Sequence, residues 1–169
     1  MKVLFLILIF ISSFSLSQTS NSQIGHDSIN TKLLNELVID QINYERSTRG
    51  IRKLVKSKTA SSAAKLHNDW MIKSNTFEHS DNGVIEIIEI NYCDGTITYS
   101  ELSKNIVKAW MDSPDHKANI LSRSFDYLGV AIGVYLKTQE SKKYLCPAGI
   151  FTYTNYSIKA TCAFNWAGK

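Results

Sequence analysis

Apolar residues recur at helical spacing in two stretches of the first half of the chain. Over residues 30–48 they would share one face of an amphipathic helix: Leu33, Leu34, Leu37, Val38, Ile42 and Tyr44. Gly50 is expected to end this helix, and 51–56 is a short link. A second helix is predicted over 59–74, from Ala60, Ala63, Ala64, Leu66, Trp70 and Met71. Its small alanine side chains indicate close packing against another element.

The middle of the chain alternates loops with shorter periodic segments. Residues 77–83 are rich in turn-forming residues, and 84–90 are apolar apart from Glu86 and Glu89, with a period that fits either a strand or a helix. A further helix is predicted from residues 98–101 to Trp110. Residues 113–115 (Ser-Pro-Asp) form a turn signal, and a second short helical pattern follows as far as Leu121.

The last third of the chain has the composition of β-structure. Strands are predicted over 128–135 and within 143–154 and 157–166, where aromatic and β-branched residues gather. Helices come first and strands last, without regular alternation. This order favours an α+β or three-layer domain.

The first residues have the pattern of a secretory signal peptide over 1–17: Lys2, an apolar run from Val3 to Ile11, and a series of small residues. The apolar run is short for a membrane span and no second one follows, so no stable membrane anchor is expected after cleavage. We therefore expect a secreted or periplasmic protein. Residues 18–30 are polar and aperiodic and are expected to be a disordered leader to a single domain over 31–169.

Charge and cysteine content narrow the function classes. The formal net charge is +4, with basic residues spread along the chain, which does not favour nucleic-acid binding. The basic residues between Arg46 and Lys58 are expected to lie in solvent.

Three cysteines in an exported chain suggest one disulfide and one free thiol. Cys146 with Cys162 is the preferred pair, and pairs that involve Cys93 stay open.

Two histidines beside predicted helix ends, His79 and His116, are the candidates for chemistry. Glu86 and Glu89 lie between them in an apolar run, and a buried carboxylate needs a partner such as an imidazole. One site could therefore hold both histidines and one glutamate. Alternatively, His79 only caps a turn and the glutamates occupy the wet face of a strand. His67 is interpreted as a structural hydrogen-bonding residue.

Five segments in order resemble the CAP superfamily of cysteine-rich secretory proteins, antigen 5 and pathogenesis-related protein 1, in its bacterial, SCP-like form. They are residues 37–46, 63–71, 77–80, 110–121 and 128–133. The resemblance covers almost the whole predicted domain. It implies an α-β-α sandwich with a central antiparallel sheet, and a cleft of two histidines and two acids. In some members that cleft binds a divalent metal such as zinc.

By motif, His79 matches the histidine of the family's Phe-x-His, and His116 that of its Ser-Pro-Gly-His, so both are the implied metal ligands. The family's Gly-Glu-Asn-Ile motif is not preserved. Its best match is Ile-Glu-Ile-Ile at 85–88, which makes Glu86 the cleft acid and Glu89 the fallback. Asp112 lies near the position expected for the second acid. The glycine that usually precedes the second histidine is replaced by Asp115.

The resulting hypothesis is a secreted CAP/SCP-domain protein whose cleft binds a divalent metal (Zn²⁺ is the expected ion), a small ligand, a lipid or a peptide. The alternative is a metal-dependent, protease-like hydrolase that uses the same cleft, with Glu86 or Glu89 as base. A third hypothesis is an interaction domain in which the histidines are retained but have no binding or catalytic role. No serine or cysteine nucleophile with an adjacent base is evident, so no catalytic activity is predicted.

Overall fold

The computed structural model describes residues 20–24, 29–81, 83–93, 97–136, 143–146, 149–152 and 156–165. The expected signal peptide over 1–17 lies outside the described residues. In the described ranges, no helix combines the length and the apolar character that a bilayer span requires.

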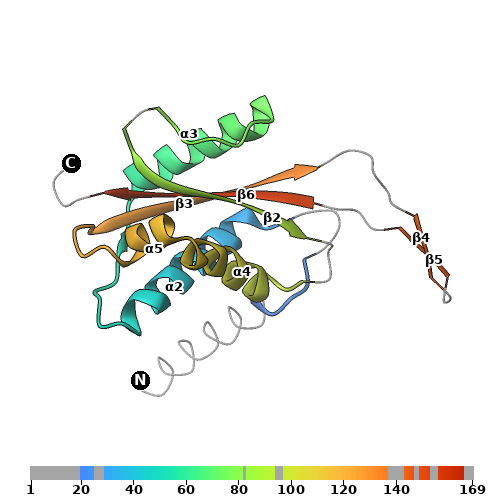
Figure 1. Cartoon of the computed structure of the whole chain (residues 1–169), viewed down its shortest axis with the longest axis horizontal. Helices are drawn as coiled ribbons and strands as arrows, with labels where there is room; N and C mark the ends of the chain where they lie inside the picture. Colours follow the sequence, from blue (N-terminus) through green and yellow to red (C-terminus); the bar gives the residue numbers. More distant parts are fainter. Residues whose placement is uncertain are drawn as a thin grey trace, which may run out of the picture.

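The predicted helices and strands are present (Figure 1). The helices are α2 (Thr31–Ser47), α3 (Lys58–Ser74), α4 (Tyr99–Asp112) and α5 (Pro114–Leu121). The strands are β1 (Val55–Lys56), β2 (Ile85–Cys93), β3 (Tyr127–Leu136), β4 (Lys143–Cys146), β5 (Gly149–Thr152) and β6 (Tyr156–Asn165). The ambiguous segment over 84–90 is thus a strand.

Each helix begins with residues that commonly occupy helix N-termini, as side-chain caps or as a proline in the first turn. The side chains of Asn30 and Ser57 accept hydrogen bonds from backbone N–H groups in the first turns of α2 and α3. Thr98 and Glu101 form a reciprocal capping box at α4. Pro114 occupies the first turn of α5, where its missing N–H is not needed. These signals are local, which explains why the sequence reveals the helix starts.

A four-stranded sheet in the order β1-β3-β6-β2 forms the middle layer. β6 pairs antiparallel with both β3 and β2, while the two-residue β1 pairs parallel with the start of β3. The sheet is therefore mixed, where the resemblance implied an antiparallel one, because part of the link over 51–56 pairs with β3. Helix α3 covers one face and α2, α4 and α5 cover the other, which confirms the α-β-α sandwich (Figure 1).

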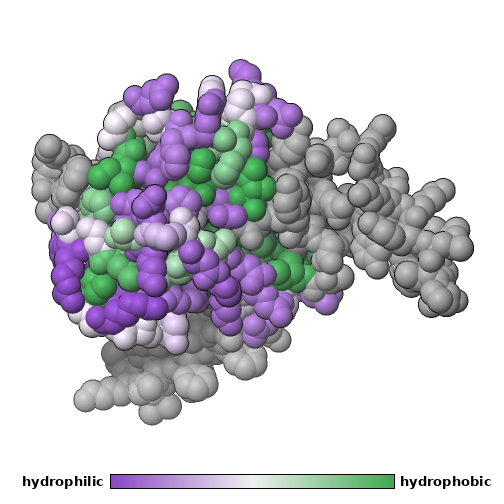
Figure 2. Space-filling view, in the orientation of Figure 1, coloured by the Kyte–Doolittle hydropathy of each residue, from purple (hydrophilic) through white to green (hydrophobic). Residues whose placement is uncertain are grey.

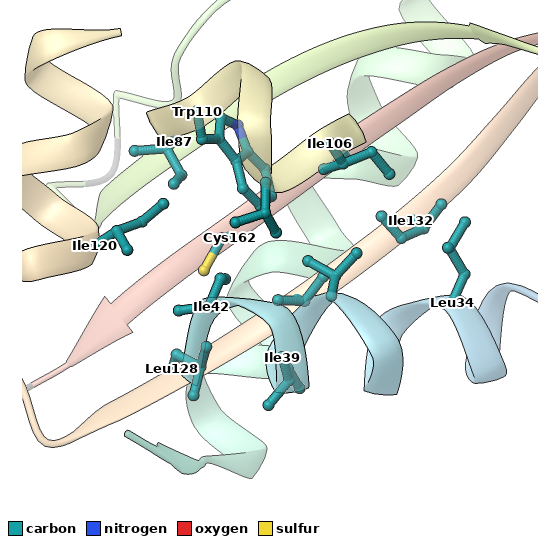
Figure 3. Close-up of a cluster of buried hydrophobic side chains, with 14 of the residues drawn as sticks. Leu34, Ile39, Ile42, Ile87, Ile106, Trp110, Ile120, Leu128, Ile132 and Cys162 are labelled. Carbon is teal, nitrogen blue, oxygen red and sulfur yellow. The ribbon is translucent and has the colours of Figure 1, made fainter. Parts of the chain in front are cut away.

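The strand register separates the two faces of the sheet. Ile87, Cys162 and Val130 lie side by side on β2, β6 and β3, in the main core against α2 and α4. Figure 3 shows Ile87 and Cys162 in this core. The neighbouring row of Glu86, Ala163 and Gly129 belongs to the opposite face, against α3, because successive side chains point to opposite sides of a strand.

The packing of α3 on the sheet depends on small residues. A methyl group built on Gly129 would lie 2.0 Å from the backbone N of Ser61, so the helix backbone rests directly on this glycine. Around it, a second buried cluster consists of Ala60, Ala64, Ala131 and Ala163. The expectation that the alanines of this helix mark close packing is confirmed.

Three expectations about burial, order and disulfide pairing are wrong in the part of the chain that the structure describes. Within the expected leader, Ile24 is 1% exposed and its N–H donates to the carbonyl of Ile97 at 3.0 Å, so this part is ordered against the domain. Cys162 is a free thiol in the core, so it does not pair with Cys146. Arg46 is fully buried, although a solvent-exposed position was expected. A single apolar residue, thiol or arginine carries no sequence pattern that reveals such burial.

Candidate functional site

Glu86 lies at the start of β2, and its side chain is only 3% exposed. The pleat of the strand turns it toward α3, and its Oε1 accepts a hydrogen bond from the backbone N of Ser80 at 2.6 Å. Two imidazoles lie beside the same oxygen: Nε2 of His67 at 3.3 Å and Nδ1 of His79 at 3.5 Å. The buried carboxylate therefore has the partners that its burial requires.

The structure distinguishes Glu86 from Glu89. Glu89 is two residues from Ile87 on the same strand, so the pleat places both on the main-core face of the sheet, opposite Glu86. Partial burial there raises the pKa of the Glu89 carboxyl. Glu86 is therefore the glutamate that meets the histidines.

His79 comes from the loop between α3 and β2, and its side chain is 56% exposed. Because its Nδ1 faces the carboxylate of Glu86, its other ring nitrogen, Nε2, lies on the far side of the ring from that carboxylate. A carboxylate beside one nitrogen of a histidine is a common way to present the other nitrogen to a metal.

His116 lies in the first turn of α5, two residues after Pro114. Its ring centroid is 6.5 Å from that of His79, with 67° between the ring planes. Its Nδ1 is buried and has no hydrogen-bond partner among the described residues. Burial and the neighbouring His79 lower the pKa of the His116 imidazole, while Asp115 opposes this shift. The neutral, lone-pair-bearing form is thus favoured.

His67 completes what we call the histidine cluster: His67, His79, His116 and Glu86. Its side chain is 4% exposed on α3, and its Nε2 lies 2.8 Å from the carbonyl oxygen of Glu78. Trp70 stacks on its ring, with centroids 5.5 Å apart. From sequence alone, His67 was interpreted only as a structural hydrogen-bonding residue. Its spacing from Ala64 and Met71, three and four residues away, was the signal that it lies on the buried face.

Asp112, the candidate for the second acid, is located elsewhere. Its side chain is 63% exposed and forms an ion pair with Lys108, one turn earlier on α4. The structure thus brings together His79, His116 and Glu86, and pairs Asp112 with a lysine instead.

Two buried cations anchor the elements that carry the histidines. Nζ of Lys159, on β6, donates to the carbonyls of Met71 and Thr76 at the end of α3, just before the His79 loop. Arg46, on α2, donates to the carbonyls of Ile120 and Ser122 at the end of α5. Neither role was predicted from sequence, because each joins segments that are distant along the chain.

The residues of the histidine cluster fit a metal site with free coordination positions better than one in which the protein supplies every ligand. Within the described part of the chain, no group of three or more His, Cys, Asp or Glu side chains has the spacing of a metal site. His79 and His116 nevertheless offer two neighbouring imidazoles in an edge-to-face arrangement, and the buried Nδ1 of His116 lacks a partner among the described residues. Two nitrogen ligands would leave the remaining positions to water or to a bound ligand.

Comparisons with known proteins agree with this architecture. The model of the Cysteine-rich secretory protein family (CAP) matches residues 39–156. The uncharacterized protein YkwD of Bacillus subtilis (strain 168) is 30% identical over 103 residues, which cover 55% of this chain and 40% of YkwD. The chain thus spans less than half the length of that relative.

Two solved structures share the fold. An outer surface protein from Borrelia burgdorferi superposes with a TM-score of 0.53 and 17% identity, over 84% of this chain and 98% of that one. The protein MpPR-1i superposes with a TM-score of 0.52 and 13% identity, over 82% of this chain and 90% of that one. At these identities the likeness concerns the fold alone.

Proposed function

The chain belongs to the cysteine-rich secretory protein (CAP) family, and from this premise we propose that it is an exported binding module whose His79 and His116 together bind a divalent metal ion such as Zn²⁺. The observation that carries the proposal is the buried Nδ1 of His116, which lacks a hydrogen-bond partner among the described residues, in a ring whose centroid is 6.5 Å from that of His79. The signal-peptide pattern over 1–17 supports export.

The chemistry of both rings suits this role. A metal binds the neutral imidazole, and burial favours that form of His116 by lowering its pKa. Two imidazoles on one tetrahedral Zn²⁺ have centroids about 5 Å apart, since each Zn–N bond is about 2.0–2.1 Å. The observed separation is 6.5 Å. A small movement of the exposed His79 ring toward His116 would therefore complete the pair.

A two-histidine site also leaves room for a further ligand. Bound zinc would supply a Lewis acid with free coordination positions. A carboxylate of a peptide or of a small molecule is suited to such a position. We infer that the bound ion would serve as an attachment point for such a ligand.

Hydrolysis finds less support in the geometry. A general base needs an accessible lone pair close to the attacking water. Oε1 of Glu86 already faces the N–H of Ser80 and two imidazoles, and its side chain is 3% exposed. Glu89 is on the opposite face of the sheet. Binding is therefore the function that the arrangement supports best.

Titration of zinc chloride into the purified protein by calorimetry tests the proposal. We expect a Kd in the micromolar range or tighter, about 8 kcal/mol or more, and a loss of at least tenfold in His79→Ala and in His116→Ala. Lys117→Ala is the matched control, because Lys117 is an exposed neighbour of His116 on the same helix. Absence of binding in wild-type protein with a folded circular-dichroism spectrum would overturn the proposal.

A further inference from the structure

We propose that His67 is a positioning residue of the histidine cluster: through Glu86 it holds His79 with the ring proton on Nδ1, which leaves Nε2 free to bind. The contacts of His67 with the loop before β2 carry this inference. It deepens the proposed function, but the proton position on His79 can be measured without any metal.

The proton position on His67 follows from its neighbours. Its Nε2 lies 2.8 Å from the carbonyl oxygen of Glu78 and 3.3 Å from Oε1 of Glu86. A carbonyl oxygen can only accept a hydrogen bond, so Nε2 of His67 must be the protonated nitrogen. This N–H donates to the carbonyl of Glu78, and the same nitrogen lies beside the carboxylate of Glu86, so His67 contacts both the loop backbone and the acid.

The same pair of side chains fixes three successive residues of the loop. The carbonyl of Glu78 meets His67, the ring of His79 meets Glu86, and the N–H of Ser80 donates to Glu86 at 2.6 Å. The loop that carries His79 is thus attached on both sides of that residue. Such attachment determines where the imidazole lies and which edge it turns toward the carboxylate.

Electrostatics then selects the tautomer of His79. A neutral imidazole has one N–H and one lone pair, and a carboxylate favours the N–H on the nitrogen that faces it. That nitrogen is Nδ1, at 3.5 Å from Glu86 Oε1. The lone pair therefore lies on Nε2. Without His67, the loop would lose the donor to the Glu78 carbonyl, and the carboxylate of Glu86 would lose the N–H that lies beside it.

Trp70 contributes by covering His67. The indole and imidazole planes are 20° apart, so Trp70 stacks on the imidazole, and the His67 side chain is 4% exposed. Exclusion of water strengthens the contacts that the buried N–H makes.

Two substitutions separate the N–H donor from the shape of the side chain. In His67→Gln the side-chain amide can place an N–H near the position of Nε2, although the stacked ring is lost. In His67→Phe the ring remains against Trp70, but the donor is lost. If His67 acted by packing alone, Phe would be the milder change. Positioning through the N–H predicts that Gln is milder.

Long-range ¹H–¹⁵N spectra test which of the two variants is milder. They are recorded on the metal-free protein at about pH 8, where imidazoles are mostly neutral. We expect His79 to carry its proton on Nδ1 in wild type and in His67→Gln. In His67→Phe we expect a shift toward the Nε2–H tautomer that free histidine prefers. An unchanged tautomer in His67→Phe, or an equal shift in both variants, would overturn the inference.

Zinc titration of the same proteins adds a second readout. Loss of a residue that orients a metal ligand commonly costs 10- to 100-fold in affinity, so we expect a loss of about that size in His67→Phe and less than about threefold in His67→Gln. A wild type that binds no zinc but shows the expected tautomers would overturn the proposed function and support the positioning role.

Discussion

The guanidinium of Arg46 donates a hydrogen bond from Nη1 to the backbone carbonyl of Ile120, 74 residues further along the chain, at 2.6 Å. The same side chain also reaches the carbonyls of Arg52 and Ser122, each at 2.8 Å. One fully buried arginine thus joins the end of α2 to the end of the helix that carries His116.

Arg46→Lys should destabilise the protein, although it preserves the charge. An ammonium group lacks the planar fork that reaches carbonyls in several directions, and buried carbonyls would be left without donors. We expect the free energy of unfolding, measured with urea, to fall by about 2–4 kcal/mol. Arg49→Lys is the control, because Arg49 forms an exposed pair with Glu45, and should change it by less than about 0.5 kcal/mol. Equal effects of the two variants would contradict the role of Arg46.

Gly129→Ala should weaken the packing of α3 on the sheet. The added methyl group would meet the backbone of Ser61 at 2.0 Å, and a helix backbone cannot move aside without loss of its other contacts. Overpacking of this kind costs about 1–3 kcal/mol, which urea unfolding would detect.

Gly133→Ala provides a matched comparison on the same strand. A methyl group there would meet the side-chain atoms of Ile72 and Asn68, at 2.0 and 2.3 Å. The end of the Ile72 side chain can rotate, while the Asn68 amide is held by hydrogen bonds to the carbonyls of Ala131 and Lys159. Because the nearest atoms belong to side chains and not to a helix backbone, we expect this variant to be the less destabilised of the two. The opposite order would mean that α3 does not rest on Gly129 as described.

Glu86→Gln should weaken zinc binding while the protein stays folded. The amide oxygen can still accept from Ser80, but the neutral side chain no longer favours the proton on Nδ1 of His79. We expect a loss of about tenfold or more in affinity by calorimetry. Glu89→Gln changes a glutamate on the same strand but on the opposite face, and should leave the affinity unchanged. If Glu89→Gln were the more damaging variant, the assignment of the two faces would be wrong.

The pKa of His116 should reflect its burial and its charged neighbours. Burial and His79 lower its pKa from the ordinary value of 6.5, and Asp115 opposes the shift. An NMR titration should therefore place His116 below 6.5, and lower still in Asp115→Asn. A value above 6.5 in wild type, or a rise in Asp115→Asn, would contradict this account.

The same shift gives the direction of a pH effect on stability. Because the pKa is lower in the folded state, the unfolded chain takes up this proton first as the pH falls through 6.5. The contribution of His116 to the free energy of unfolding is therefore greatest above 6.5 and is lost as the pH falls toward its folded pKa. In His116→Gln, urea unfolding over this range should show a weaker decline than in wild type.

The surface carries several exposed hydrophobic side chains, and at least one of them has a structural role. Figure 2 shows hydrophobic and hydrophilic residues interspersed over the face in view. Among the described residues, the large hydrophobic side chains that remain exposed are Tyr44, Val55, Leu66, Trp70 and Phe77. Trp70 stacks on His67, so even an exposed aromatic residue can have a structural role that its polarity does not reveal.

The sequence by itself determined the features that depend on neighbours along the chain. Helical spacing located the helices, and residue composition located β3 and β6. Local motifs were also sufficient to single out His79 and His116, which the structure places with their rings 6.5 Å apart.

The tertiary structure alone decided which residues complete the site. From the sequence of residues 85–90, either Glu86 or Glu89 could be the acid that meets the histidines. Pairing of β2 with β6 sets the register, which turns Glu86 toward α3. The hydrogen bonds of Arg46 and the contact of His67 with Glu86 also join residues that are far apart in sequence, and the free thiol of Cys162 is buried by the same assembly. Such contacts leave no periodic pattern, because their partners are brought together only when the sheet and its two helical layers assemble.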